Sequence, residues 1–142
     1  LAQKTNTDDV FNIVKDFRNK DKTTPIILMG YLNPIEIMGY KKFVEKASKV
    51  GVDGLLLTVP AYNKPPQEGL YQNFKSIAAA TNLPGLLYNV PSRTSLNMDA
   101  ETTLRLAEID NIVGVKEASS DYSQITNIID KRRGEDFFFR LR

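Results

Sequence analysis

Short apolar runs recur along the chain, and amphipathic segments separate them. The runs span residues 23–31, 53–60, 83–90 and 112–118, with a shorter one at 136–141. A half-buried strand would alternate apolar and polar side chains, whereas these runs are apolar on both faces. Strands of that kind are typical of parallel sheets covered by helices. The pattern therefore predicts an α/β fold built from repeated βα units.

The segments between the runs carry apolar residues at helical spacing. The first predicted helix has its N-cap and acidic first turn at Thr7, Asp8 and Asp9. One face of it then carries Val10, Phe11, Ile13, Val14 and Phe17. A second helix is expected over 35–50, ending at Gly51. A third is expected to begin at Pro65 and Pro66, a fourth after Asp99, and a fifth after Ser120 or Asp121.

Composition narrows the classes of protein that this chain can be. Its 142 residues suit a single α/β domain over 1–142, and 42% apolar with 25% charged residues is typical of a globular protein. A net charge of +2 does not favour nucleic acid, and no apolar run approaches the ~20 residues of a membrane span. With neither cysteine nor histidine, no metal site is expected, and we expect a cytoplasmic protein.

The predicted strands end in similar short sequences. Tyr31, Tyr62 and Tyr88 are each followed within two residues by an asparagine and then by a proline. Asparagine and proline are common in turns, so part of this repeat is loop chemistry. Ligand sites of parallel sheets lie at the carboxyl ends of the strands. The three phenols are therefore expected on one rim, beside Lys116 of the next strand.

Lys116 has two interpretations, because it follows an apolar run that reads as a buried strand. In the first, its side chain reaches water at the rim, where it could pair with Glu117. In the second, a partly buried amine attacks a carbonyl carbon and forms a Schiff base. Such an amine needs a proton relay, and Tyr88 is the nearest candidate in a chain without histidine. Arg93 could then hold a carboxylate bidentately.

Two long stretches favour the second interpretation. "YNKPPQEGLYQNFKSIAAATNLPGLLYNVPSRT" and "LAEIDNIVGVKEASSD" resemble the dihydrodipicolinate synthase family over about residues 59–136. That family consists of class I Schiff-base lyases of lysine biosynthesis, with a (βα)8 TIM barrel. The resemblance implies that 58–142 has that origin and that Lys116 forms an imine with pyruvate or another 2-oxo acid. No organic cofactor is implied, since the imine itself is the electron sink.

The resemblance also assigns roles to the neighbours of Lys116. The tyrosine of "YNVP", Tyr88, is the proton relay, and Asn89 beside it is expected to contact the substrate. The arginine of "PSRT", Arg93, holds the carboxylate of the second substrate. The tyrosine of "YNKPP", Tyr62, belongs to the relay of a neighbouring subunit and implies a dimer.

Residues 6–57 resemble a different barrel, the tryptophan synthase α subunit. "TTPIILMGYLNPIEIMGYKKFVEKASKVGVDGLL" carries this resemblance. The domain is therefore predicted to be a chimera, natural or engineered, with a tryptophan synthase-like segment over 1–57. The join falls in "GVDGLLLTVP", where both barrels run their fourth strand, so the strand register is expected to be kept.

No "GTTGE"-like loop is present, although the lyase family uses one in its proton relay and to hold the pyruvate carboxylate. We expect a partial (βα)8 TIM barrel with about four or five βα units in a parallel sheet. Its edges could be closed by a second copy, or the sheet could relax to an open flavodoxin-like one. The expected function is a barrel fragment that keeps the Schiff-base lysine and forms at most an imine. The alternative is an active lyase that condenses pyruvate with an aldehyde.

Overall fold

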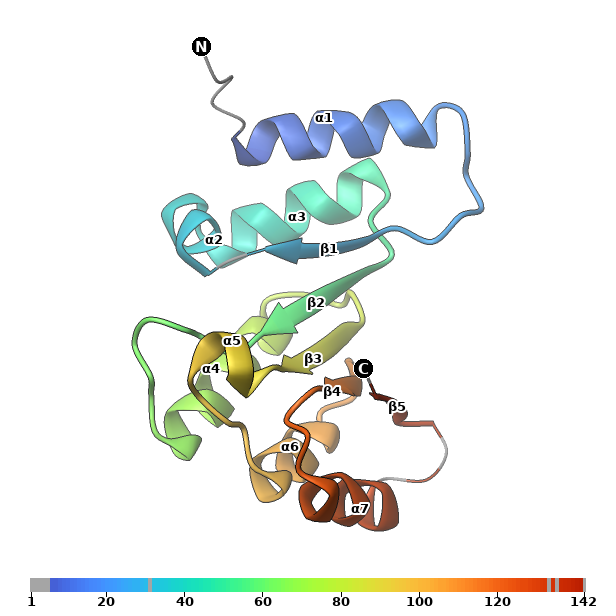
Figure 1. Ribbon diagram of the computed structural model, residues 1–142. Helices are drawn as coiled ribbons and strands as arrows, with labels where there is room; N and C mark the ends of the chain where they lie inside the picture. Colours follow the sequence, from blue (N-terminus) through green and yellow to red (C-terminus); the bar gives the residue numbers. More distant parts are fainter. Residues whose placement is uncertain (1–5, 31, 133, 135, 142) are drawn as a thin grey trace.

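A computed structural model describes residues 6–30, 32–132, 134 and 136–141, so Tyr31 lies outside the described residues. Their strands form one parallel sheet in the order β1-β2-β3-β4-β5. These strands are β1 (Ile27–Gly30), β2 (Gly54–Thr58), β3 (Gly85–Asn89), β4 (Ile112–Glu117) and β5 (Phe138–Leu141). Figure 1 shows them fanning from β1 near the N-terminus to β5 near the C-terminus.

The strand order decides between the two predicted sheets. Each strand pairs with the next one along the chain, without a reversal of direction. A flavodoxin-like sheet needs a switch in strand order, because its chain winds both ways from a central strand. The flavodoxin-like alternative is therefore wrong. The partial TIM barrel is confirmed, as an open sheet that β1 and β5 bound within the described residues.

The helices pack on one face of this sheet. They are α1 (Thr7–Arg18), α2 (Leu32–Met38), α3 (Tyr40–Val50), α4 (Gln67–Ala79), α5 (Pro91–Thr94), α6 (Ala100–Ala107) and α7 (Tyr122–Lys131). On the helix-covered face, Leu55, Leu87 and Val115 are buried. On the other face, Met29 and Phe138 are 62% and 54% exposed. That uncovered side, called the open face below, consists of Ile27, Met29, Leu56, Thr58, Leu86, Tyr88, Lys116, Phe138 and Arg140.

Several helix ends differ from the prediction. The N-cap of α1 is Asn6, whose side chain accepts from the backbone of Asp8 and Asp9. The single helix predicted over 35–50 is divided into α2 and α3, because Gly39 takes a φ of 85° that breaks the helical hydrogen bonding. Gly51 ends α3 in the left-handed conformation, as predicted.

The buried apolar side chains form two clusters. The larger one lies under β2, β3 and β4 and includes Phe74, Leu87 and Val115, all 0% exposed. The smaller one lies between β1, α1 and α3 and includes Phe11, Phe43 and Leu55. Phe11 and Val14 supply the buried side of α1, while Val10, Ile13 and Phe17, predicted on the same face, are at least one-third exposed. The first helix therefore buries less of its apolar face than its pattern predicted.

Candidate functional site

Tyr88 and Lys116 lie side by side on the open face. They are register partners on the neighbouring parallel strands β3 and β4, both near the carboxyl ends. The Lys116 Nζ lies 4.1 Å from the centroid of the Tyr88 ring, within the range of a cation–π contact. Tyr88 is buried and Lys116 is half-buried. The structure thus brings together the predicted nucleophile and the predicted proton relay.

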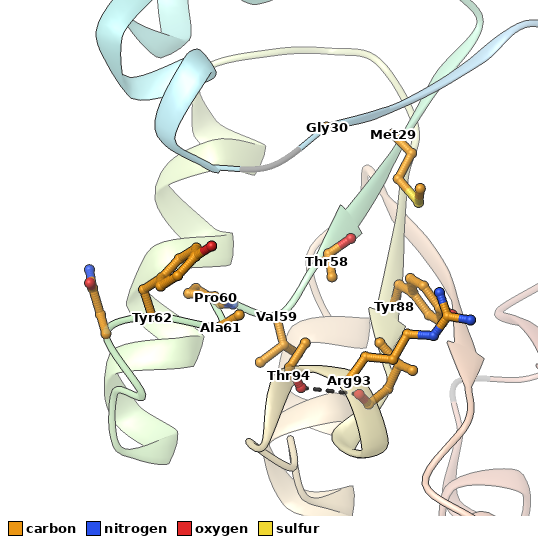
Figure 2. Close-up of a pocket in the computed structure, with 12 residues that line it drawn as sticks. Met29, Gly30, Thr58, Val59, Pro60, Ala61, Tyr62, Tyr88, Arg93 and Thr94 are labelled. Atoms are coloured by element: carbon orange, nitrogen blue, oxygen red, sulfur yellow. Dashed lines mark hydrogen bonds between the residues drawn. The ribbon is translucent and has the colours of Figure 1, made fainter.

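A cavity of about 160 Å³ opens beside Tyr88. One water needs only about 10–15 Å³, so the cavity has room for a small organic molecule. It is lined by the ends of β1, β2 and β3 and the loops that follow them, including Thr58, Tyr62, Tyr88 and Arg93. Figure 2 shows Thr58 between Tyr62 on one side and Tyr88 with Arg93 on the other.

Arg93 reaches the cavity from the short helix α5. Pro91 opens this helix, where its fixed φ suits the first turn and its missing N–H costs no hydrogen bond. Thr94 is buried and donates its hydroxyl to the Val90 carbonyl at 3.2 Å, which ties the helix to the end of β3. Arg93 itself is exposed. The predicted carboxylate anchor therefore lies on a helix tied to the end of β3, with its exposed side chain beside Tyr88.

Tyr62 lines the same cavity but lies apart from Tyr88. It belongs to the loop between β2 and α4 and is 83% exposed. A phenol this exposed does not share a closed relay with Lys116 within one chain. The predicted role across a dimer interface stays a prediction.

Asn89 lies on the opposite face of the sheet, among the helices. Its side chain is fully buried, and its Nδ2 donates to both carboxylate oxygens of Glu117 at 3.0 and 3.1 Å. Its Oδ1 accepts from the Met98 backbone at 3.0 Å. Glu117, 1% exposed, also accepts from Gln124 Nε2 at 3.1 Å and Ser119 N at 2.8 Å. The structure does not place Asn89 with the other predicted site residues; it ties the ends of β3 and β4 together.

The sequence analysis missed residues that line the cavity. Thr58 is the register partner of Tyr88 and puts a hydroxyl on the same face. Its position as the one polar residue at the end of an apolar strand was the available signal. Met29, also at the cavity, gave none, because a methionine in an apolar run is expected in a core.

Two further features bear on the kind of site. Within the described ranges, His, Cys, Asp and Glu side chains form no group of three or more that could hold a metal ion. Among the same residues, no helix combines the length and the apolar character needed to cross a membrane.

Comparison with known sequences gives matches over the part of the chain that carries the site. A sequence model of the Dihydrodipicolinate synthetase family matches residues 40–139. The 4-hydroxy-tetrahydrodipicolinate synthase of Moorella thermoacetica is 68% identical over 84 residues, 59% of this chain and 29% of that protein. The Bacillus subtilis enzyme of the same name is 54% identical over 98 residues, 68% of this chain and 33% of that protein.

Solved structures match almost the whole chain. The dihydrodipicolinate synthase of Acinetobacter baumannii, solved in complex with pyruvate, gives a TM-score of 0.83 at 37% identity, covering 99% of this chain and 47% of that one. The Thermotoga maritima enzyme gives 0.83 at 37% identity over 97% of this chain and 48% of that one. The chain thus spans about half the length of these structures.

Proposed function

The chain belongs to the Dihydrodipicolinate synthetase family, and on that premise we propose that Lys116 forms a Schiff base with a 2-oxo acid such as pyruvate. The observation that carries the proposal is the position of the Lys116 Nζ, 4.1 Å from the centre of the Tyr88 ring beside the cavity. Tyr88 lines that cavity and Lys116 contacts the Tyr88 ring, so a carbonyl compound held beside Tyr88 would lie close to the amine. The matched A. baumannii structure holds pyruvate, which fits a cavity of this size.

The chemistry requires two proton transfers and no redox step. The neutral amine of Lys116 adds to the carbonyl carbon, and a proton moves from nitrogen to oxygen to give a carbinolamine. The hydroxyl group then leaves as water when it accepts a proton, and the C=N bond forms. We assign these proton transfers to Tyr88, which is buried beside the amine.

The proposed activity ends at the imine. Complete condensation needs a second substrate held at the reacting carbon, and rates fall steeply when such a constellation is misplaced. Arg93 is present for that second substrate, but no "GTTGE"-like loop is in the sequence and the open face has no cover among the described residues. Full condensation of pyruvate with an aldehyde is the second candidate. The position of Arg93 beside Tyr88 favours it.

Borohydride trapping tests the proposal. The protein is incubated with pyruvate and sodium borohydride, and the modified lysine is located by peptide mass spectrometry. We expect a reduced adduct on Lys116, lost in Lys116→Arg and weakened in Tyr88→Phe. Lys75, an exposed lysine on α4, serves as the matched control, and Lys75→Arg should leave the adduct unchanged. Labelling spread over surface lysines would overturn the proposal, while product formation with an added aldehyde would favour the second candidate.

We also propose that the open face is covered by a second copy of this chain. Ile27, Met29 and Phe138 are more than half exposed on it, although they are apolar. Among the described residues, β1 and β5 are the edge strands of the sheet, and such edges pair with other strands. Light scattering after size exclusion should give twice the 16.0 kDa of one chain, and Phe138→Ser should lower that mass. A single-chain mass at micromolar concentration would overturn this assembly.

Finally, we propose that residues 1–57 descend from a barrel like the tryptophan synthase α subunit. The proposal is supported over residues 1–39, because the family sequence model begins at residue 40 while the structural match covers 99% of the chain. Replacing residues 6–53 by the matching segment of the B. subtilis enzyme should keep the fold and raise trapping at Lys116. Unchanged trapping would speak against a foreign first segment.

The cytoplasmic location stays a prediction.

A further inference from the structure

Arg140 lies on the open face next to Lys116. Strand β5 pairs with β4 so that Arg140 is the register partner of Lys116, which is itself the register partner of Tyr88. Registered residues of neighbouring parallel strands share a face, and the strands are about 4.8 Å apart. Thr58, Tyr88, Lys116 and Arg140 therefore form one row across four strands.

The charge of this row suits an anion. Arg140 is exposed, and the ion pairs among the described residues are Arg18–Asp53, Lys46–Asp8 and Arg105–Glu68, so Arg140 is in none of them. Glu117, the nearest carboxylate along β4, faces the helices and is occupied by Asn89 and Gln124. Within the row itself, no residue is acidic.

A 2-oxo acid has its carboxylate bonded directly to the carbonyl carbon that an amine attacks. When Lys116 reacts with that carbon, the carboxylate must lie within one strand spacing of the amine. A guanidinium binds a carboxylate through two parallel hydrogen bonds, which fixes its direction as well as its place. The register puts Arg140 on the strand next to Lys116, on the side away from Tyr88.

Building on the proposed function, we infer that Arg140 anchors the carboxylate of the 2-oxo acid that reacts with Lys116. The site then selects ketones with an adjacent carboxylate over neutral ketones of the same size. Arg140 takes no part in the bond changes. Arg93, which lines the cavity beside Tyr88, is left for a second carboxylate.

The test compares pyruvate with pyruvamide, its neutral counterpart of the same shape, in borohydride trapping at Lys116. The ratio of the two labelling rates is the readout, because the difference in intrinsic carbonyl reactivity cancels when ratios are compared between variants. Arg140→Gln should lower the pyruvate-to-pyruvamide ratio by about tenfold or more, as expected when a hydrogen bond to a charged group is lost. Arg140→Lys should keep part of the preference, because it keeps the charge and loses the bidentate geometry.

Arg105→Gln is the matched control. It removes the same charge from an exposed arginine on α6, where the partner is Glu68. An unchanged ratio in Arg140→Gln, or an equal fall in Arg105→Gln, would overturn the inference. Labelling of Lys116 by both compounds without dependence on Arg140 would reject the anchor and leave the imine intact. If neither compound labels Lys116, the proposed function and the anchor both fall.

Discussion

The two regions of the sheet bury their apolar side chains to different degrees. Residues 58–141 surround a cluster whose central side chains, such as Phe74, Leu87 and Leu106, are 0% exposed. Residues 6–57 build a smaller cluster and leave Ile13, Ile27 and Ile37 more than half exposed. The family sequence model covers only residues 40–57 of the segment 6–57, called the first region below, but residues 58–139 of the segment 58–141, called the second region.

The polar contacts differ in the same way. In the second region, the buried carboxylate of Glu117 receives hydrogen bonds from Asn89, Gln124 and Ser119. In the first region, Arg18 extends from the end of α1 and donates to the carbonyls of Gly51 and Thr24 at 2.8 and 2.7 Å. It also pairs with the half-exposed Asp53. The polar contacts of Glu117 are buried, whereas Arg18 in the other region pairs with a carboxylate that is half exposed.

Leu57 joins the two regions, because it packs against both clusters from β2. The comparison teaches that a sheet can keep its register while its two halves differ in burial. Strand pairing depends on backbone hydrogen bonds that any sequence can make, whereas core packing depends on particular side chains.

Loss of an aromatic ring from each cluster gives the largest expected effects. Phe74→Ala should reduce the free energy of unfolding by about 3–5 kcal/mol, because its site is enclosed on all sides. Phe11→Ala should cost about 3 kcal/mol or less, because its neighbours Val10 and Ile13 are exposed and the cavity can fill. Urea unfolding measures both, and equal losses would remove the distinction between the regions.

Removal of the buried carboxylate comes next. Glu117→Gln should cost about 1–3 kcal/mol, because the new amide group turns a donor toward Asn89, Gln124 or Ser119. Glu108 is an exposed glutamate at the end of α6, and Glu108→Gln should change the free energy of unfolding little. The same urea titration compares the two variants. Similar losses would show that the hydrogen bonds to the Glu117 carboxylate do not contribute to stability.

The surface contact of the first region is expected to contribute less. Arg18→Ala should cost about 1–2 kcal/mol, since it leaves the carbonyls of Gly51 and Thr24 without their donor. Lys46→Ala breaks only the exposed pair with Asp8 and should cost less. Thermal unfolding followed by circular dichroism checks the order, and a larger loss in Lys46→Ala would contradict it.

The smallest expected effect is a pH dependence of the stability of the fold, which comes from Asp21 in the loop before β1. The hydroxyls and backbone N–H groups of Thr24 and Thr23 hold the pKa of the Asp21 carboxyl well below its ordinary 3.8. A lowered pKa stabilises the fold above the unfolded value, and this stabilisation is lost as the pH falls toward the folded value. The difference in Tm between the native chain and Asp21→Ala should therefore shrink between pH 5 and about pH 2. A constant difference would show that the carboxylate charge is not involved.

Asp121, the N-cap of α7, gives the same test in the second region. Hydrogen bonds from Ser123 and Gln124 lower the pKa of its carboxyl. Asp121→Ala should show the same sign of pH dependence in Tm, since both carboxylates act as acceptors in local turns. Opposite signs would mean that another group titrates in this range.

Much of the fold follows from local signals in the sequence. Apolar runs without alternation gave the parallel strands, and Gly51, Asp99 and Asp121 mark helix ends where they were expected. The break at Gly39 was missed, because an isolated glycine in a helical pattern is tolerated in many helices. Helix α5 was missed as well, since four residues are too few to show a helical period.

The candidate site divides in the same way. Residue type and the family resemblance were enough to select Lys116, Tyr88 and Arg93, and the structure brings all three to one end of the sheet. Asn89 could not be assigned to a face from its position beside Tyr88. Successive residues of a strand point to opposite sides, so Asn89 faces the helices.

The sequence by itself determined the strands, most helix ends and the choice of Lys116 as the candidate nucleophile, because these depend on residue type and on neighbours along the chain. The tertiary structure decided the strand order, the open face and the register that puts Arg140 beside Lys116. Those features depend on which backbone groups of distant segments hydrogen-bond to one another. A shift of one residue in that pairing would move every side chain of β5 to the other face.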